Sequence, residues 1–251
     1  MLRRVAILVY GVVSYAIFFA TFLYGIGFIG GFLVPTQLDG TPTGSTAVAV
    51  AIDLALLSLF ALQHSGMARP AFKKWLTRYI PESTERSTYV LLSSVALLAV
   101  FLLWQPIGGV IWDVQQPLLR AILYGLFGAG WLIVLITTFL INHFDLFGLR
   151  QVWLAYQGKP YTSLEFKTPG PYKLVRHPLY IGWLTVFWAT PTMTVSHLLF
   201  AVVTTLYILA AIQWEERDLV AAHPEYDDYR RRVPMLVPRM EAKTAREASA
   251  R

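Results

Sequence analysis

The chain has 251 residues, of which 56% are apolar and only 14% are charged, and its mean hydropathy is +0.52. Ordinary soluble domains have about 25% charged residues, so this composition excludes a typical soluble enzyme and is too apolar for a disordered chain. The absence of cysteine excludes disulfides, thiolate metal sites and a cysteine nucleophile. The net charge is +6, and the basic residues lie in the gaps between apolar runs. This distribution favours contact with a lipid bilayer over binding to nucleic acid.

Long uncharged runs predict helices that cross a bilayer, for which about 20 residues suffice. The first run, 5–34, is too long for a signal peptide and is followed by a Pro/Gly/Thr turn region. The next three runs cover 46–63, 87–112 and 118–141. Asp53 is the only charged residue inside the second run. A carboxylate in such a segment is either a functional residue or pairs with a polar side chain of a neighbouring helix and fixes their packing.

The last apolar region consists of a short stretch, 179–190, and a longer one, 195–214, separated by Pro191. The short stretch is only about 18 Å long as a helix, so we expect a C-terminal helical hairpin that need not cross the bilayer fully. The sequence therefore predicts an all-α, polytopic integral membrane protein with about five transmembrane helices.

Lysine and arginine alternate between the gaps. They occur at the N-terminus, in 64–86, in 142–178 and from Arg217 onward. The gaps 35–45, 105–117 and 191–196 contain neither residue, and Arg120 lies just inside the run that follows the second of them. The positive-inside rule places both termini and both long loops in the cytoplasm.

Two polar clusters near the C-terminus are candidates for ligand binding. In the first, 170–182, Pro178 opens a helix whose first N–H groups could face a carboxylate, and two tyrosines offer flat faces to an adenine or a sulfonium. The second, Glu215–Glu216, ends the last apolar helix, where acidic residues oppose the helix dipole. It could accept ribose hydroxyls or balance a cation. The structural alternatives are a proline-stabilised interfacial loop and a solvated charged turn.

Two further clusters contain histidines at the ends of spans. His143 and Asp145 follow the fourth run and could share one small volume. His64 follows the second run and could be an axial ligand or part of a capped helix end. Neither cluster supplies the three or four ligands of a usual metal site, so we predict none.

Residues 176–182, Arg-His-Pro-Leu-Tyr-Ile-Gly, followed after the hairpin by Glu215–Glu216, resemble the isoprenylcysteine carboxyl methyltransferase / phospholipid methyltransferase superfamily. Pro224–Arg230 and Val233–Pro234 resemble the end of that family, so the resemblance covers 165–239. It implies an integral membrane methyltransferase with a cytoplasmic cofactor pocket for S-adenosyl-L-methionine.

The N-terminal half resembles the bacterial methanethiol S-methyltransferases in 64–69, Glu85–Arg86 and 143–151. That resemblance implies a bacterial inner (cytoplasmic) membrane location and a small thiol substrate, methanethiol, converted to dimethyl sulfide. The first motif is also similar to NnrU-type membrane proteins.

The resemblance divides the chain into helices 1–4 with their cytoplasmic loop (1–141), a cofactor-binding loop, hairpin and tail (142–239) and a disordered tail (240–251). The cofactor contacts it implies are Tyr172, Val175, Arg176, His177, Tyr180, Gly182 and Glu215 or Glu216.

A thiol must ionise before it attacks a sulfonium, and a neighbouring base accelerates such a step. We expect His143, oriented or balanced by Asp145, to be this base, with His64 as the second candidate. The alternatives are a methyltransferase acting on a prenylcysteine carboxylate or a lipid amine, a membrane reductase of the sterol-reductase type, and a haem-handling NnrU-like protein.

Overall fold

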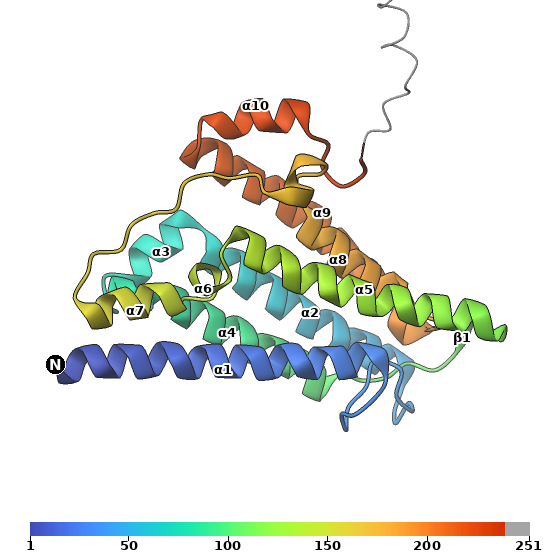
Figure 1. The fold of residues 1–251 in the computed structure, drawn as a ribbon. Coiled ribbons are helices and arrows are strands. Elements are labelled where there is room, and N and C mark those ends of the chain that lie inside the picture. Colours follow the sequence, from blue (N-terminus) through green and yellow to red (C-terminus); the bar gives the residue numbers. More distant parts are fainter. Residues whose placement is uncertain (239–251) are drawn as a thin grey trace, which may run out of the picture.

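The computed structural model describes residues 1–238, and the predicted tail 240–251 lies outside them. The described part is almost entirely helical, with one short pair of strands (Figure 1). Its elements are α1 (Leu2–Gly30), α2 (Thr46–Ala68), α3 (Pro70–Leu76), α4 (Glu82–Leu103), β1 (Val110–Asp113), α5 (Pro117–Ile141), α6 (His143–Leu146), α7 (Leu149–Gln157), the 3-10 turn η1 (Gly170–Lys173), α8 (Pro178–Trp188), β2 (Thr192–Thr194), α9 (Val195–Ala222) and α10 (Glu225–Arg232).

Five of these helices, α1, α2, α4, α5 and α9, are long and apolar enough to cross a membrane. Large apolar side chains such as Leu62 and Leu206 lie exposed on them, as expected for helices that face lipid. The prediction of an all-α, multi-pass membrane protein is therefore confirmed.

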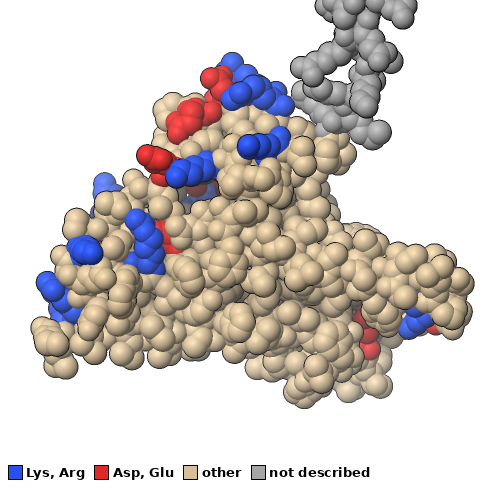
Figure 2. Space-filling view, viewed as in Figure 1, with Lys and Arg blue, Asp and Glu red and all other residues tan. Residues whose placement is uncertain are grey.

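Charged side chains are concentrated at one end of the bundle, which we call the basic end. Figure 2 shows them around α10 and the N-terminal part of α1, with a broad uncharged surface beside them. Arg3 and Arg4 open α1, Lys73 and Lys74 lie in α3, and α10 ends in three arginines at 230–232.

The helix ends follow local sequence signals, but several differ from the predicted runs. Helix α1 ends at Gly30 rather than 34. Helix α9 continues past 214 to Ala222, so Glu215 and Glu216 lie within the helix and do not end it, contrary to the sequence-based expectation. The run predicted at 87–112 is wrong in its bounds because α4 begins at Glu82 and ends at Leu103. Pro106 restricts the preceding residue to extended backbone, which stops the helix. In contrast, α2 continues past Gln63 to Ala68, so His64 lies on the helix.

The hairpin of α8 and α9 is tied to the end of the bundle opposite the basic end. Its tip, β2, pairs antiparallel with β1 in the α4–α5 connection, a ladder that the sequence did not predict. Thr194 caps α9 by accepting a hydrogen bond from the N–H of His197 at 3.0 Å. The hairpin therefore reaches the segment that joins the far ends of α4 and α5.

Asp53, the lone acid inside a predicted span, is fully buried. Its Oδ1 accepts a hydrogen bond of 2.9 Å from the backbone N–H of Gln105, just past the end of α4. This contact satisfies a backbone N–H in the loop after α4, which supports the packing interpretation of Asp53.

Two glycines let α8 approach α5 closely. A Cβ at Gly182 would lie 2.9 Å from the carbonyl oxygen of Gly130 and 2.8 Å from Val134, and a Cβ at Gly130 would lie 3.0 Å from the carbonyl oxygen of Gly182. Backbone atoms cannot move aside cheaply, so this crossing requires both glycines. It fixes the position of α8, and with it the segment that precedes α8.

We predict that Gly182→Ala lowers the free energy of unfolding by about 1–3 kcal/mol, because the added methyl group overpacks the α5–α8 crossing. Thermal unfolding in detergent measures the effect. Gly128→Ala in α5 is the matched control, since nothing lies within 4 Å of its added Cβ. Equal melting temperatures for the two variants would contradict the close crossing.

Candidate active site

A buried ion network, which we call the clamp, joins Arg176, His177 and Glu216 near the basic end. Arg176 Nε donates to Glu216 Oε1 at 2.7 Å, and His177 Nε2 donates to the same oxygen at 2.8 Å. The Glu216 residue is only 5% exposed and His177 only 6%. A buried carboxylate is tolerated only when it is paired and hydrogen-bonded, so Glu216 ties α9 to the segment before α8.

The clamp also holds the C-terminal segment. Arg176 Nη1 donates to the carbonyl oxygens of Arg230 and Val233 at 2.9 and 2.6 Å, and the backbone N–H of Arg176 donates to Pro234 at 2.9 Å. The backbone N–H of His177 donates to Met235 at 3.2 Å. The backbone N–H groups of Arg176 and His177 are therefore occupied by protein carbonyls.

A second set, the tyrosine–glutamate cluster, consists of Tyr172, Tyr180 and Glu215. The Tyr180 hydroxyl donates to Glu215 Oε2 at 2.8 Å. The hydroxyl of Tyr172 is buried without a hydrogen-bond partner, and it lies close enough to Glu215 to feel its charge. Burial, and then the charge of Glu215, raises the pKa of Tyr172, so its hydroxyl remains a donor at neutral pH.

The remaining two residues of the predicted cofactor set have packing positions. Val175 is buried, and its N–H donates to Pro171. Gly182 faces α5 at the crossing described above. The structure thus separates the predicted set into the clamp, the tyrosine–glutamate cluster and these two packing residues.

His143 is 3% exposed and lies between α1 and α5. Its Nδ1 is 2.8 Å from the Thr138 hydroxyl, which itself donates to the carbonyl of Leu135, so Nδ1 carries the proton. Its Nε2 then accepts from the Tyr15 hydroxyl at 2.8 Å. Burial lowers the pKa of His143, which keeps the ring neutral at pH 7.

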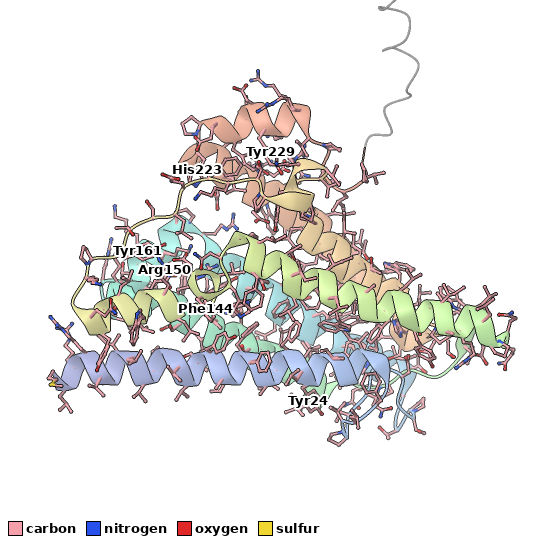
Figure 3. All side chains as sticks on the ribbon, viewed as in Figure 1. Tyr24, Phe144, Arg150, Tyr161, His223 and Tyr229 are labelled. Carbon is pink, nitrogen blue, oxygen red and sulfur yellow. The ribbon has the colours of Figure 1, made fainter. Side chains whose placement is uncertain are left out.

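In the described part of the chain, the Asp145 carboxylate forms no hydrogen bond with the His143 ring. It accepts instead from Arg150 Nη1 at 2.8 Å and from the Tyr161 hydroxyl at 3.4 Å. Figure 3 shows Arg150 and Tyr161 close together near α6 and α7, where the loop toward η1 begins. Phe166, further along this loop, packs against Tyr229 of α10 with ring centroids 5.5 Å apart. Asp145 therefore helps to anchor this loop.

His64 belongs to a different polar group, formed by α2 and α4. The Tyr89 hydroxyl lies 2.9 Å from His64 Nε2, and the Ser93 hydroxyl lies 3.2 Å from Nδ1. The hydroxyl of Ser65, the residue after His64, lies 2.9 Å from that of Tyr207 in α9. His64 thus lies beside the helix that contains Glu215. Sequence reasoning missed Tyr89, although it is a polar residue inside an apolar span.

Two cavities lie away from these residues. One, of about 110 Å³, is lined by Asp39, Thr190 and His197 among others, near the hairpin tip. The other, of about 390 Å³, is a groove between α1 and α4 that includes Tyr10 and Thr88. No group of three metal-binding side chains occurs within residues 1–238. None of the candidate residues lines either cavity, so the candidate site is identified from the side chains that several elements bring together.

The fold and the site together define a multi-pass membrane protein with an acidic, tyrosine-rich cluster held by buried ion pairs. A methanethiol S-methyltransferase of Crocosphaera subtropica is 58% identical over 238 residues, covering 94% of this chain and 93% of that protein. Another from Mycobacterium tuberculosis is 52% identical over 238 residues, covering 94% and 98%. The chain belongs to the methanethiol S-methyltransferase family.

Nurim from Sus scrofa is 35% identical over 187 residues, covering 70% of this chain and 70% of that protein. No family model matches the chain. No solved structure matches it either.

We predict that the two adjacent glutamates have separable roles. Glu216→Gln lowers the free energy of unfolding by about 3–5 kcal/mol, because it leaves buried partners unpaired. Glu215→Gln leaves the melting temperature nearly unchanged but weakens binding of S-adenosylhomocysteine, measured by isothermal titration calorimetry. Wild-type affinity in Glu215→Gln, or wild-type stability in Glu216→Gln, would contradict this division.

We also predict a histidine-dependent loss of stability in acid. The buried His143 resists protonation, whereas the unfolded chain takes up this proton near pH 6.5. Protons therefore favour the unfolded state, and stability falls as the pH drops below about 6.5. The melting temperature of His143→Gln should fall less between pH 7.5 and pH 5 than that of the wild type. Parallel curves for the two proteins would exclude His143 as a cause.

Proposed function

We propose that this protein transfers a methyl group from S-adenosyl-L-methionine to methanethiol, forming dimethyl sulfide. The single observation that carries the proposal is the tyrosine–glutamate cluster, with its buried unpartnered Tyr172 hydroxyl, in a chain whose relatives are named methanethiol S-methyltransferases.

The residues present fit this donor. Its ribose hydroxyls need an acceptor, which Glu215 offers, and its cationic sulfonium is compatible with a carboxylate and with aromatic faces. The unpartnered hydroxyl of Tyr172 is a donor that the folded chain alone leaves unsatisfied. Tyr180 orients Glu215 through their 2.8 Å hydrogen bond.

In this proposal the clamp acts on the site without touching the reacting atoms. Arg176 and His177 share the Glu216 carboxylate, so they fix the last turns of α9 against the segment that contains Tyr172. Glu215 and Tyr172 are thereby held at a constant separation. Such positioning reduces the entropy lost on reaching a reactive geometry.

When bound, S-adenosyl-L-methionine supplies a sulfonium methyl group whose bond to sulfur breaks as the bond to the thiol sulfur forms, and the thiol proton leaves to a base. We assign this proton to His64, because its neighbour Ser65 contacts Tyr207 of α9, the helix that contains Glu215. Apolar walls exclude water, which would otherwise stabilise the separated thiolate and sulfonium charges.

The proposed location is the bacterial inner membrane, with both termini and the basic end in the cytoplasm. The distribution of lysine and arginine between the spans supports this orientation. Methanethiol is small and apolar enough to dissolve in lipid, so it can reach the site from the bilayer.

We expect the purified protein in detergent to convert S-adenosyl-L-methionine and methanethiol into dimethyl sulfide, detected in the headspace by gas chromatography. A parallel reaction with methyl-labelled donor and bacterial lipid extract tests a lipid amine, and one with a prenylcysteine tests a carboxylate. If the label appeared in lipid or prenylcysteine but not in the headspace, that compound and not the thiol would be the methyl acceptor. No labelled product from folded protein would refute the proposed activity.

A further inference from the structure

The polar group around His64 is not part of the clamp or of the tyrosine–glutamate cluster. His64 lies in α2, Tyr89 and Ser93 lie in α4, and all three occur inside apolar spans. Polar side chains are costly in such segments and usually serve a function there. Tyr89 is 8% exposed, so its hydroxyl is largely shielded from solvent.

The contacts of His64 fix the orientation of its ring. The hydroxyl of Tyr89 lies 2.9 Å from Nε2 and 3.1 Å from Nδ1, and the hydroxyl of Ser93 lies 3.2 Å from Nδ1. The ring of Phe60 stacks on the imidazole at a centroid distance of 5.1 Å. The imidazole is therefore held between an aromatic face and a phenol, and its hydrogen-bonding edge faces Tyr89.

Contacts of α2 near His64 join this polar group to the helix that contains Glu215. The hydroxyl of Ser65, the residue after His64, lies 2.9 Å from that of Tyr207 in α9. The Phe60 ring, which stacks on His64, also packs against the Tyr207 ring with centroids 6.2 Å apart. The His64 group therefore lies beside α9, the helix that contains Glu215.

Positive charge at this place favours a bound thiolate. The guanidinium of Arg86 lies 5.1 Å from the centre of the Tyr89 ring, and its Nε is held by the carbonyl oxygen of Leu146 at 2.7 Å. Arg86 and Arg69 are both within electrostatic reach of the Tyr89 hydroxyl. A nearby positive charge stabilises an anion and so assists ionisation of a thiol.

We propose that His64 and Tyr89 form the thiol subsite, in which Tyr89 is a positioning residue that orients His64 to accept the thiol proton. This assignment rests on the proposed function. In the step, the S–H bond breaks, the proton moves to the imidazole, and the sulfur keeps the electron pair. With this pair the sulfur would bond to the methyl carbon as the bond from that carbon to the sulfonium sulfur breaks, which releases dimethyl sulfide and S-adenosylhomocysteine. The Phe60 ring provides an apolar contact for a small substituent on the sulfur.

The test is Tyr89→Phe, which keeps the ring and removes only the hydroxyl. We expect kcat with methanethiol to fall about 10- to 100-fold at pH 7, within the range of general base catalysis, with unchanged affinity for S-adenosylhomocysteine by calorimetry. The defect should shrink at about pH 9.5, because a much larger fraction of the thiol is then ionised in solution than at pH 7. His64→Gln should show the same pH-dependent defect, and it is the second variant should Tyr89→Phe not fold.

The matched control is Tyr10→Phe. The Tyr10 hydroxyl hydrogen-bonds at 2.9 Å to Thr88, the neighbour of Tyr89, and so joins α1 to α4 without any contact to His64. This variant should keep the wild-type pH–rate profile while losing a comparable interhelical hydrogen bond.

Four results would overturn the assignment. Wild-type rates in Tyr89→Phe and His64→Gln would exclude both residues from the subsite, as would a defect that is equal at all pH values. A large loss of S-adenosylhomocysteine affinity in Tyr89→Phe would move this residue to the donor site. A wild-type protein that binds S-adenosylhomocysteine but methylates no thiol would instead refute the proposed function, and this assignment with it.

Discussion

A carboxylate buried near the end of an apolar helix must be neutralised, and Glu216 meets this requirement by binding Arg176 and His177 together. The same arginine also holds the carbonyl oxygens of Arg230 and Val233. Helix α9, the segment before α8 and the chain after α10 are thereby drawn to one point. The positions of Tyr172, Tyr180 and Glu215 all depend on this network.

Adjacent residues on a helix point about 100° apart, so Glu215 and Glu216 cannot face the same partners. Glu216 faces Arg176 and His177. Glu215 instead faces Tyr180, and its charge acts on the buried hydroxyl of Tyr172. In our proposal the Glu216 carboxylate stabilises the structure, and the Glu215 carboxylate binds a ligand. In our account this division lets a membrane enzyme hold a polar, cationic donor beside a lipid-soluble acceptor.

The number of the spans could be predicted because the bilayer imposes a long apolar run on every crossing helix. The segment around Arg176 and the Glu215–Glu216 pair were recognisable from their local residue pattern. Other features depend on contacts between distant segments: the β1–β2 ladder, the pairing of Asp145 with Arg150, and the contact between His64 and Tyr89. No local pattern encodes them, so the contacts that favour His64 over His143 in our proposal could not enter the sequence-based prediction.

The most direct test of this account is an experimental structure of the protein with S-adenosylhomocysteine bound in a lipid nanodisc. The account predicts the ribose of the ligand within hydrogen-bonding distance of Glu215, the Tyr172 hydroxyl in contact with the ligand, and the Arg176–His177–Glu216 network intact. A ligand bound in the cavity near His197, or one that displaces Arg176 from Glu216, would contradict it.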